Sequence, residues 1–196
     1  MLQIDRELLE KTFYRLVAAQ SISGTRDENQ STKEIKACFA EMPYFQQHPE
    51  YLKAFPIPND GFGREVVTAL VKGDGSSNKT IVMIGHSDVV DASDYGINED
   101  VAFDPKTLMA RMKNVAMNPD AKKDFESEEW IFGRGVMDMR CGVAVTMMML
   151  EAASRNPAEV KGNLLFVAVP DEENNSLGMI SATKNRSVAS VGMSSG

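Results

Sequence analysis

Apolar residues recur at helical spacing in two stretches near the start of the chain. The first stretch runs from Asp5, a residue type that caps helices, to about Ala19. The second follows Ser31 and Glu34, whose spacing is that of a capping box, and we expect it to end at Pro43. The apolar stripes of the two helices are Leu8, Leu9, Phe13, Leu16 and Val17, and Ile35, Cys38, Phe39 and Met42.

The rest of the chain alternates predicted strands with one buried helix. Residues 64–73 are rich in β-branched side chains and end in glycine. Residues 80–85 and 163–169 are continuous apolar runs, which are typical of strands buried on both faces of a sheet. Residues 143–156 are apolar nearly all round, so we expect a buried helix there. The pattern predicts an α/β sheet covered by helices on both faces.

Composition narrows the class of protein. The chain has 196 residues, which suit one domain, and its 43% hydrophobic and 25% charged residues are typical of a globular protein. A net charge of −7 argues against nucleic acid or an anionic membrane as a partner. Two cysteines, Cys38 and Cys141, form no disulfide framework, so we expect a cytoplasmic protein. We expect both thiols to be buried and inert.

A histidine follows the apolar run of residues 80–85 directly. His86 and Asp88 stand in the sequence "IGHSDVVD". Ligands of α/β sheets bind beyond the carboxyl ends of strands, and neutral imidazole is a common zinc ligand. A carboxylate two residues away can reach the other ring nitrogen and fix its tautomer. The simpler alternative is a hydrogen-bonded histidine beside a turn aspartate.

Two further segments complete the candidate chemistry. Asp138 stands in "FGRGVMDMRCG", which has neither a dinucleotide-binding nor a P-loop spacing; the alternative is a glycine turn with a capping aspartate. Asp171, Glu172 and Glu173 follow the last strand, where self-repulsion and desolvation oppose three carboxylates in a row. A cation or a proton-transfer task explains such a triplet, and so does a solvated acidic turn.

Taken together, these segments supply the ligands of a metal site. Histidine, aspartate and glutamate suit zinc, and also manganese or cobalt. We therefore predict that His86, Asp138 and one carboxylate of the triplet converge at the carboxyl edge of the sheet, as in a metallohydrolase.

Three ordered motifs give the chain a family resemblance. "GHSDVVD", "GRGVMDMRCG" and "VPDEENNSLG" resemble the dinuclear-zinc peptidase and deacylase family, which includes acetylornithine deacetylase, succinyl-diaminopimelate desuccinylase, peptidase T and the glutamate carboxypeptidases. The residues around them look most like the arginine-utilisation, RocB-like branch. The resemblance implies a three-layer α/β/α catalytic domain with a largely buried mixed sheet. It also implies cleavage of an amide bond in a small peptide or N-acyl amino acid.

The resemblance assigns roles to five residues. His86 would ligate one of two divalent ions, and Asp88 would orient the His86 ring. Zinc is the most suitable ion, with manganese or cobalt as alternatives. Asp138 would bridge the two ions, and Glu173 would ligate the second. Glu172 would be the general base that activates a water and returns its proton to the leaving amine.

The resemblance also implies parts that these 196 residues lack. The family places a further carboxylate ligand and a late histidine beyond the acidic triplet, and His48 lies too early to replace that histidine. A smaller lid and dimerisation domain is absent as well, and residues 181–196 are unlike the expected continuation. We therefore expect residues 1–196 to be the truncated N-terminal part of a catalytic domain, inactive alone, with homo-oligomers only in a full-length protein. The alternative is a non-catalytic α/β fragment or interaction module with weak residual metal binding.

Overall fold

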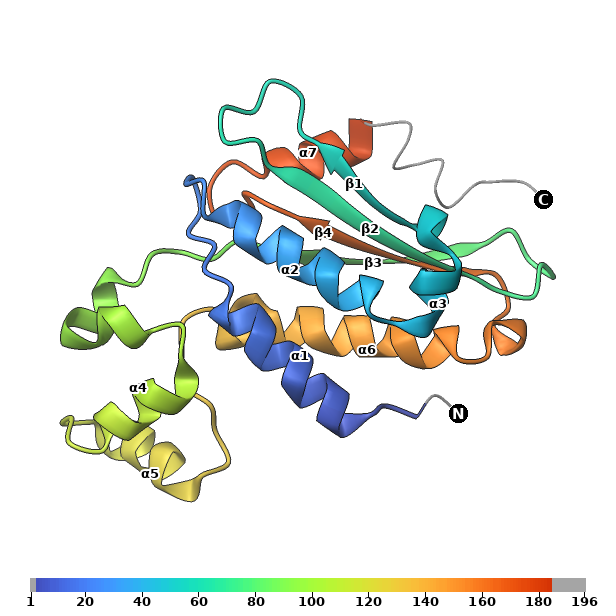
Figure 1. Ribbon diagram of the computed structural model, residues 1–196. Helices are drawn as coiled ribbons and strands as arrows, with labels where there is room; N and C mark the ends of the chain where they lie inside the picture. Colours follow the sequence, from blue (N-terminus) through green and yellow to red (C-terminus); the bar gives the residue numbers. More distant parts are fainter. Residues whose placement is uncertain (1–2, 185–196) are drawn as a thin grey trace.

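A four-stranded mixed sheet forms the centre of the fold (Figure 1). The computed structural model describes residues 3–184. The strands lie in the order β1-β2-β4-β3, in which β2 is antiparallel to both β1 and β4, and β3 is parallel to β4. Their bounds are Leu52–Pro56 for β1, Glu65–Lys72 for β2, Thr80–His86 for β3 and Asn163–Val169 for β4.

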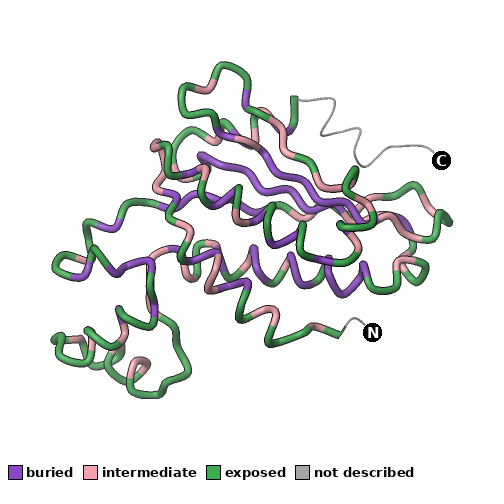
Figure 2. Tube along the Cα trace, viewed as in Figure 1, coloured by how far each residue is buried: buried purple, intermediate pink, exposed green. Residues whose placement is uncertain are grey.

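Helices cover both faces of this sheet. Helices α1, α2 and α6 lie over one face, and α7 packs against β2 and β4 on the other (Figure 1). Helices α4 and α5 form a separate lobe beside the sheet, and this lobe is mostly exposed (Figure 2). The bounds are Arg6–Ala18 (α1), Glu28–Ala40 (α2), Pro43–Gln47 (α3), Pro105–Met112 (α4), Pro119–Ser127 (α5), Gly142–Ser154 (α6) and Leu177–Lys184 (α7). The predicted three-layer α/β/α class is confirmed.

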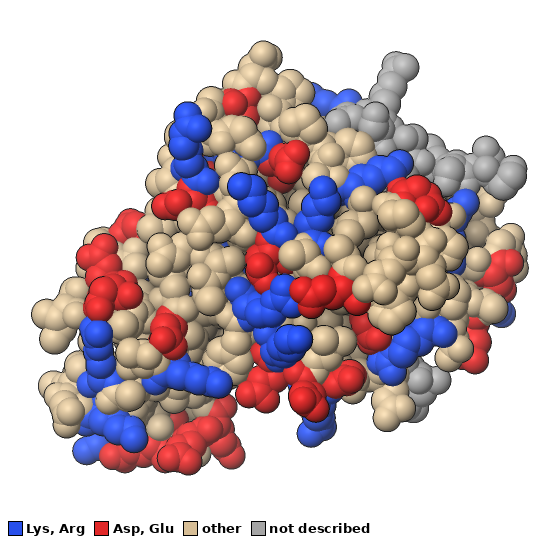
Figure 3. Space-filling view, viewed as in Figure 1, with Lys and Arg blue, Asp and Glu red and all other residues tan. Residues whose placement is uncertain are grey.

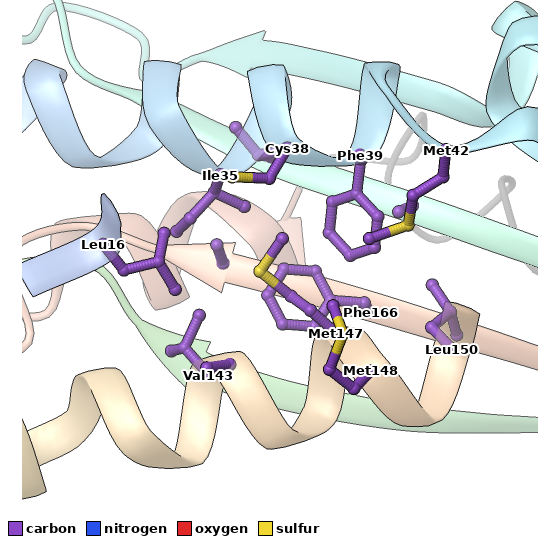
Figure 4. Close-up of a cluster of buried hydrophobic side chains, with 14 of the residues drawn as sticks. Leu16, Ile35, Cys38, Phe39, Met42, Val143, Met147, Met148, Leu150 and Phe166 are labelled. Carbon is purple, nitrogen blue, oxygen red and sulfur yellow. The ribbon is translucent and has the colours of Figure 1, made fainter. Parts of the chain in front are cut away.

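The largest of the three hydrophobic clusters among the described residues lies between the sheet and helices α1, α2 and α6. Leu16, Phe39, Met147 and Phe166 meet there without solvent exposure, one from each helix and one from β4 (Figure 4). The ring centroids of Phe39 and Phe166 are 5.2 Å apart. A smaller core on the opposite face joins β2 and β4 to α7. This double burial explains the continuous apolar run of β4, as predicted.

The start of α2 differs from the sequence prediction. The helix begins at Glu28, so Ser31 and Glu34 lie inside it rather than forming a capping box. The hydroxyl of Ser31 instead accepts a hydrogen bond from buried Arg140, and Glu34 pairs with Arg15 of α1. Both side chains therefore bind partners on other segments, and neither caps the helix. The cap that was predicted for α1 is confirmed, because Asp5 accepts a hydrogen bond from the backbone of Leu8.

The strand β3 is less buried than its apolar run predicts. Within residues 3–184, β4 is its only partner, so β3 lies at the edge of the sheet. Ile81, Val82 and Ile84 are 63%, 50% and 46% exposed. The prediction of a strand there was correct, and the prediction of burial on both faces was wrong for the described residues. The same pattern correctly predicted burial in β4, which has neighbours on both sides.

Three further features bear on the sequence predictions. The atypical tail was predicted from residue 181, yet residues 181–184 belong to α7; the remainder lies outside the described residues. On the face seen in Figure 3, acidic and basic side chains are interspersed, so this face offers no continuous basic surface. None of the helices in residues 3–184 is both long and apolar enough to cross a bilayer.

The two cysteines differ in exposure. Cys38 is buried on α2, and burial raises the pKa of its thiol to about 12. Cys141 is exposed at the start of α6, which corrects the prediction of a buried thiol there.

We expect a thiol-alkylating reagent at pH 8 to modify Cys141 and to spare Cys38 in the folded chain, because the thiolate is the reactive species. Intact-mass analysis would then show one adduct, and unfolding in guanidinium would allow a second. Two adducts on the folded chain would contradict the burial of Cys38.

Candidate metal centre

The parallel pairing of β3 and β4 brings two of the three polar segments together. His86 is the last residue of β3 and lies opposite Val169, the last residue of β4. The backbone N–H of Ser87 donates to the carbonyl of Val169 at 2.8 Å. The segments after these two strands therefore emerge at the same edge of the sheet, as expected for parallel strands.

His86, Asp138 and Glu173 converge at this edge. The distance between His86 Nε2 and Asp138 Oδ1 is 2.8 Å. One ligand atom from each of the three side chains lies within 4.8 Å of the others. The convergence that the sequence predicted is confirmed. Glu172 also reaches the group, with Oε2 at 3.9 Å from His86 Nε2.

The carboxylates of this group face one another and the solvent. The side chains of Asp138 and Glu172 are 77% and 51% exposed, whereas His86 is buried. Burial, together with the negative charge of Asp138, raises the pKa of Glu173. Within residues 3–184, no lysine or arginine forms an ion pair with Asp138, Glu172 or Glu173. A bound cation would relieve this repulsion.

The orientation of the His86 ring is set by Asp88 through its backbone. Nδ1 of His86 lies 3.0 Å from the carbonyl oxygen of Asp88 and 3.7 Å from its carboxylate. The spacing of the two residues predicted the carboxylate of Asp88 as the acceptor, whereas the carbonyl is the group within hydrogen-bond distance. A hydrogen bond at Nδ1 leaves Nε2 free to face a metal, as is usual for histidine ligands.

The carboxylate of Asp88 has different partners. It is fully buried and accepts hydrogen bonds from the backbone N–H groups of Glu172 and Glu173, each at 3.0 Å. It also accepts from the hydroxyl of Ser23 at 2.8 Å. Asp88 therefore ties the segment after β3 to the acidic turn after β4. No sequence pattern indicated Ser23 in this role, since it stands in a polar loop 65 residues away.

A tight turn before α6 presents Asp138. Gly135 has a φ of +70°, and a Cβ at this position would lie 2.6 Å from a methyl group of Val89. The turn is anchored by Arg140, which is 1% exposed and donates to the hydroxyls of Ser21 and Ser31. Burial lowers the pKa of Arg140 to about 10. Glycine and a buried arginine thus fix the backbone on either side of the exposed Asp138 carboxylate.

Comparison with known proteins agrees with this geometry. A family model described as peptidase family M20/M25/M40 matches residues 82–194, a segment that contains His86, Asp138 and Glu173. The chain belongs to this family. Enzymes of the M20 family depend on metal ions.

Individual relatives support the assignment to the M20 family. RocB of Bacillus subtilis (strain 168) is 36% identical over 176 residues, which are 90% of this chain and 31% of RocB. YqjN of the same strain is 39% identical over 169 residues, which are 85% of this chain and 30% of YqjN. The chain thus spans about a third of the length of these curated relatives.

A solved structure shows the same fold. Human carnosine dipeptidase 1 matches with a TM-score of 0.58 over 96% of this chain and 37% of its own, at 16% identity. At this identity, the match supports the fold of the M20 catalytic domain and leaves function to the site itself.

The donor set fits a divalent metal. One imidazole nitrogen and carboxylate oxygens from two further side chains lie close enough to share ions, and they suit zinc, manganese or cobalt. Nδ1 of the histidine is already engaged by a backbone carbonyl, so the ring nitrogen that faces the carboxylates is Nε2.

Proposed function

We propose that this chain contributes the metal ligands and the general base of a metal-dependent hydrolase. The reaction is cleavage of an amide bond in a small peptide or an N-acyl amino acid. The observation that carries the proposal is the convergence of His86, Asp138 and Glu173, with Glu172 beside them. Membership of the M20 family and the dipeptidase fold of a structural neighbour support a peptide substrate.

In this proposal, each side chain has a separate task. His86 and Glu173 would each hold one of two divalent ions, most suitably zinc, and Asp138 would be shared between them. Such ions polarise a substrate carbonyl and lower the pKa of a water molecule. Glu172 takes a proton from the attacking water and returns it to the leaving amine. Asp88 orients the His86 ring through its carbonyl and holds the acidic turn through its carboxylate.

The exposure of Glu172 is consistent with its role as the base. Its side chain is half-exposed, whereas its backbone N–H is fixed to Asp88. The carboxylate can therefore move a proton between two positions while its main chain stays in place. The location of the protein and its assembly into oligomers stay predictions.

A second candidate function is a non-catalytic module that binds metal weakly. The open, solvent-exposed side chains of Asp138 and Glu172 favour it for residues 1–196 alone. Catalytic zinc usually has three protein ligands and a water, whereas two ions that share the three side chains described here would have two each.

The test compares residues 1–196 with a longer protein that carries this chain and has the length of RocB and YqjN. Both are assayed with Zn²⁺, Mn²⁺ or Co²⁺ against dipeptides and N-acetyl amino acids. We expect turnover by the longer protein and none by residues 1–196. A longer protein that binds metal and hydrolyses no member of the panel would favour the non-catalytic module.

A further inference from the structure

A buried cluster of charged side chains contacts Asp171, the first residue of the acidic turn that also contains Glu172 and Glu173. Arg64, just before β2, donates to Glu28 of α2 and to Asp171, with N–O distances of 2.7 Å in both cases. Its other terminal nitrogen donates to Asp60 at 2.8 Å. All four side chains are at most 3% exposed. One guanidinium therefore joins three carboxylates from three separate segments of the chain.

Stability alone is a weak explanation for this cluster. Removing charges from water has a large desolvation cost, and well-packed apolar residues often stabilise a core as well as a buried ion pair does. Burial raises the pKa of Glu28, which reflects that cost. A buried ionic network that reaches towards a functional site is therefore a candidate for a positioning role.

The cluster acts directly on the residue that begins the acidic turn. Glu28 accepts the backbone N–H of Asp171 at 2.9 Å, and Arg64 binds the Asp171 side chain. The other oxygen of that side chain accepts the N–H of Leu177 at 3.1 Å. Asp171 has a φ of +68°, in the left-handed region that few residues other than glycine adopt. Arg64 and Glu28 thus secure a backbone conformation that is unfavourable without such contacts.

The two residues after Asp171 are the proposed base and ligand. Their N–H groups both donate to Asp88, so the turn is fixed from the β3 side as well. A change of the backbone at Asp171 would shift both of these N–H groups and the carboxylates of the same residues. The direction in which Glu172 and Glu173 point is therefore coupled to the contacts of Arg64.

We infer that Arg64 and Glu28 are positioning residues that hold the Asp171 turn so that the carboxylates of Glu172 and Glu173 face His86 and Asp138. This inference rests on the proposed function. It assigns a task to the segment before β2 and to the start of α2, both of which lie outside the three motifs.

The variant Arg64→Lys tests the inference while keeping the positive charge. The ammonium group of lysine lacks the planar set of N–H donors with which the guanidinium binds Glu28, Asp60 and Asp171 together. We expect the affinity of residues 1–196 for Co²⁺, measured by calorimetric titration, to fall by at least about tenfold, as for other supporting residues of metal sites. In the metal-free chain, we expect faster hydrogen exchange at the N–H groups of Glu172 and Glu173, measured by NMR, with β2 unchanged.

Matched variants separate positioning from general destabilisation. Arg15→Lys alters another arginine, on α1, that binds two carboxylates, Glu34 of α2 and Glu41 just after it, and it should leave both readouts unchanged. Asp171→Asn keeps the size of the side chain and the tolerance for a positive φ. It should act in the same direction as Arg64→Lys, and it serves as the test if the lysine variant does not fold.

Two outcomes would overturn separate claims. A folded Arg64→Lys or Asp171→Asn chain with the Co²⁺ affinity and the Glu172 and Glu173 exchange rates of the parent would overturn the inference. If Glu173→Gln, run in the same titration, leaves Co²⁺ binding intact, then the proposed metal site is wrong. In that case, the hydrogen-exchange measurement still decides whether Arg64 holds the turn.

Discussion

Asp138→Ala is expected to weaken the binding of Co²⁺ or Zn²⁺ to residues 1–196 by more than about 100-fold, beyond the usual cost of losing a supporting residue. Asp138 is the proposed shared ligand, and it is the carboxylate nearest to His86, at 2.8 Å from Nε2. Its side chain is 77% exposed, so we expect the fold to tolerate the change. Calorimetric titration measures the affinity, and circular dichroism checks the fold.

The control for this experiment is Asp120→Asn. Asp120 is an exposed acid in the first turn of α5, in the lobe beside the sheet, and its replacement also removes one negative charge. We expect its metal affinity to equal that of the parent. Equal losses of metal affinity in the two variants would mean that metal binding depends on net charge alone, and the proposed site would then be wrong.

Glu172→Gln is expected to lower kcat of a longer, active protein by about 10²–10⁴-fold, the usual range for removal of a general base. Metal content should stay at the level of the parent, because Glu172 has no ligand role in the proposal. The fold of the turn should also persist, since Asp88 holds the backbone N–H of Glu172 rather than its side chain. Steady-state kinetics and metal analysis of the same preparation supply both readouts.

The comparison variant is Glu173→Gln, which alters the neighbouring carboxylate. We expect it to lose metal together with activity, because Glu173 is a proposed ligand. The two glutamines therefore separate proton transfer from metal binding. A Glu172→Gln enzyme with the turnover of the parent would rule out Glu172 as the base.

The sequence was sufficient to predict the parts of the fold that depend on local pattern. The buried helix α6 and the strand β4 follow from apolar runs, and the cap of α1 follows from Asp5. The placement of the three motifs also predicted that His86, Asp138 and Glu173 would meet, because His86 and Glu173 follow strands and Asp138 precedes a buried helix. Each of these predictions uses information that lies within a few residues or within the topology of the sheet.

Contacts between distant segments were beyond the sequence. An apolar run indicates that a strand is suited to burial, but it does not say which strands lie beside it. The sequences of β3 and β4 therefore have the same apolar pattern, although β3 lies at the edge of the sheet. Ser31 has the spacing of a cap, yet a guanidinium 109 residues away binds it. The spacing of His86 and Asp88 could not distinguish the carbonyl from the carboxylate as the acceptor.

The Arg64 cluster shows the same limit most clearly. Arg64 and Asp171 are 107 residues apart, and no sequence pattern indicates that they are partners. A charged residue before a strand is usually solvated, whereas Arg64 is almost fully buried. Only the structure shows that Arg64 and Glu28 contact the first residue of the acidic turn.

The central claim is that His86, Asp138 and Glu173 hold metal, and anomalous diffraction tests it most directly. Crystals of residues 1–196 soaked in Zn²⁺ would be measured on both sides of the zinc absorption edge. We predict a zinc peak about 2.0–2.2 Å from His86 Nε2 and from an Asp138 oxygen. A Glu173 oxygen should bind the same ion or a second ion about 3.5–4 Å away. Zinc peaks only elsewhere, for example at His48, with the His86–Asp138 hydrogen bond still in place, would contradict the proposed site.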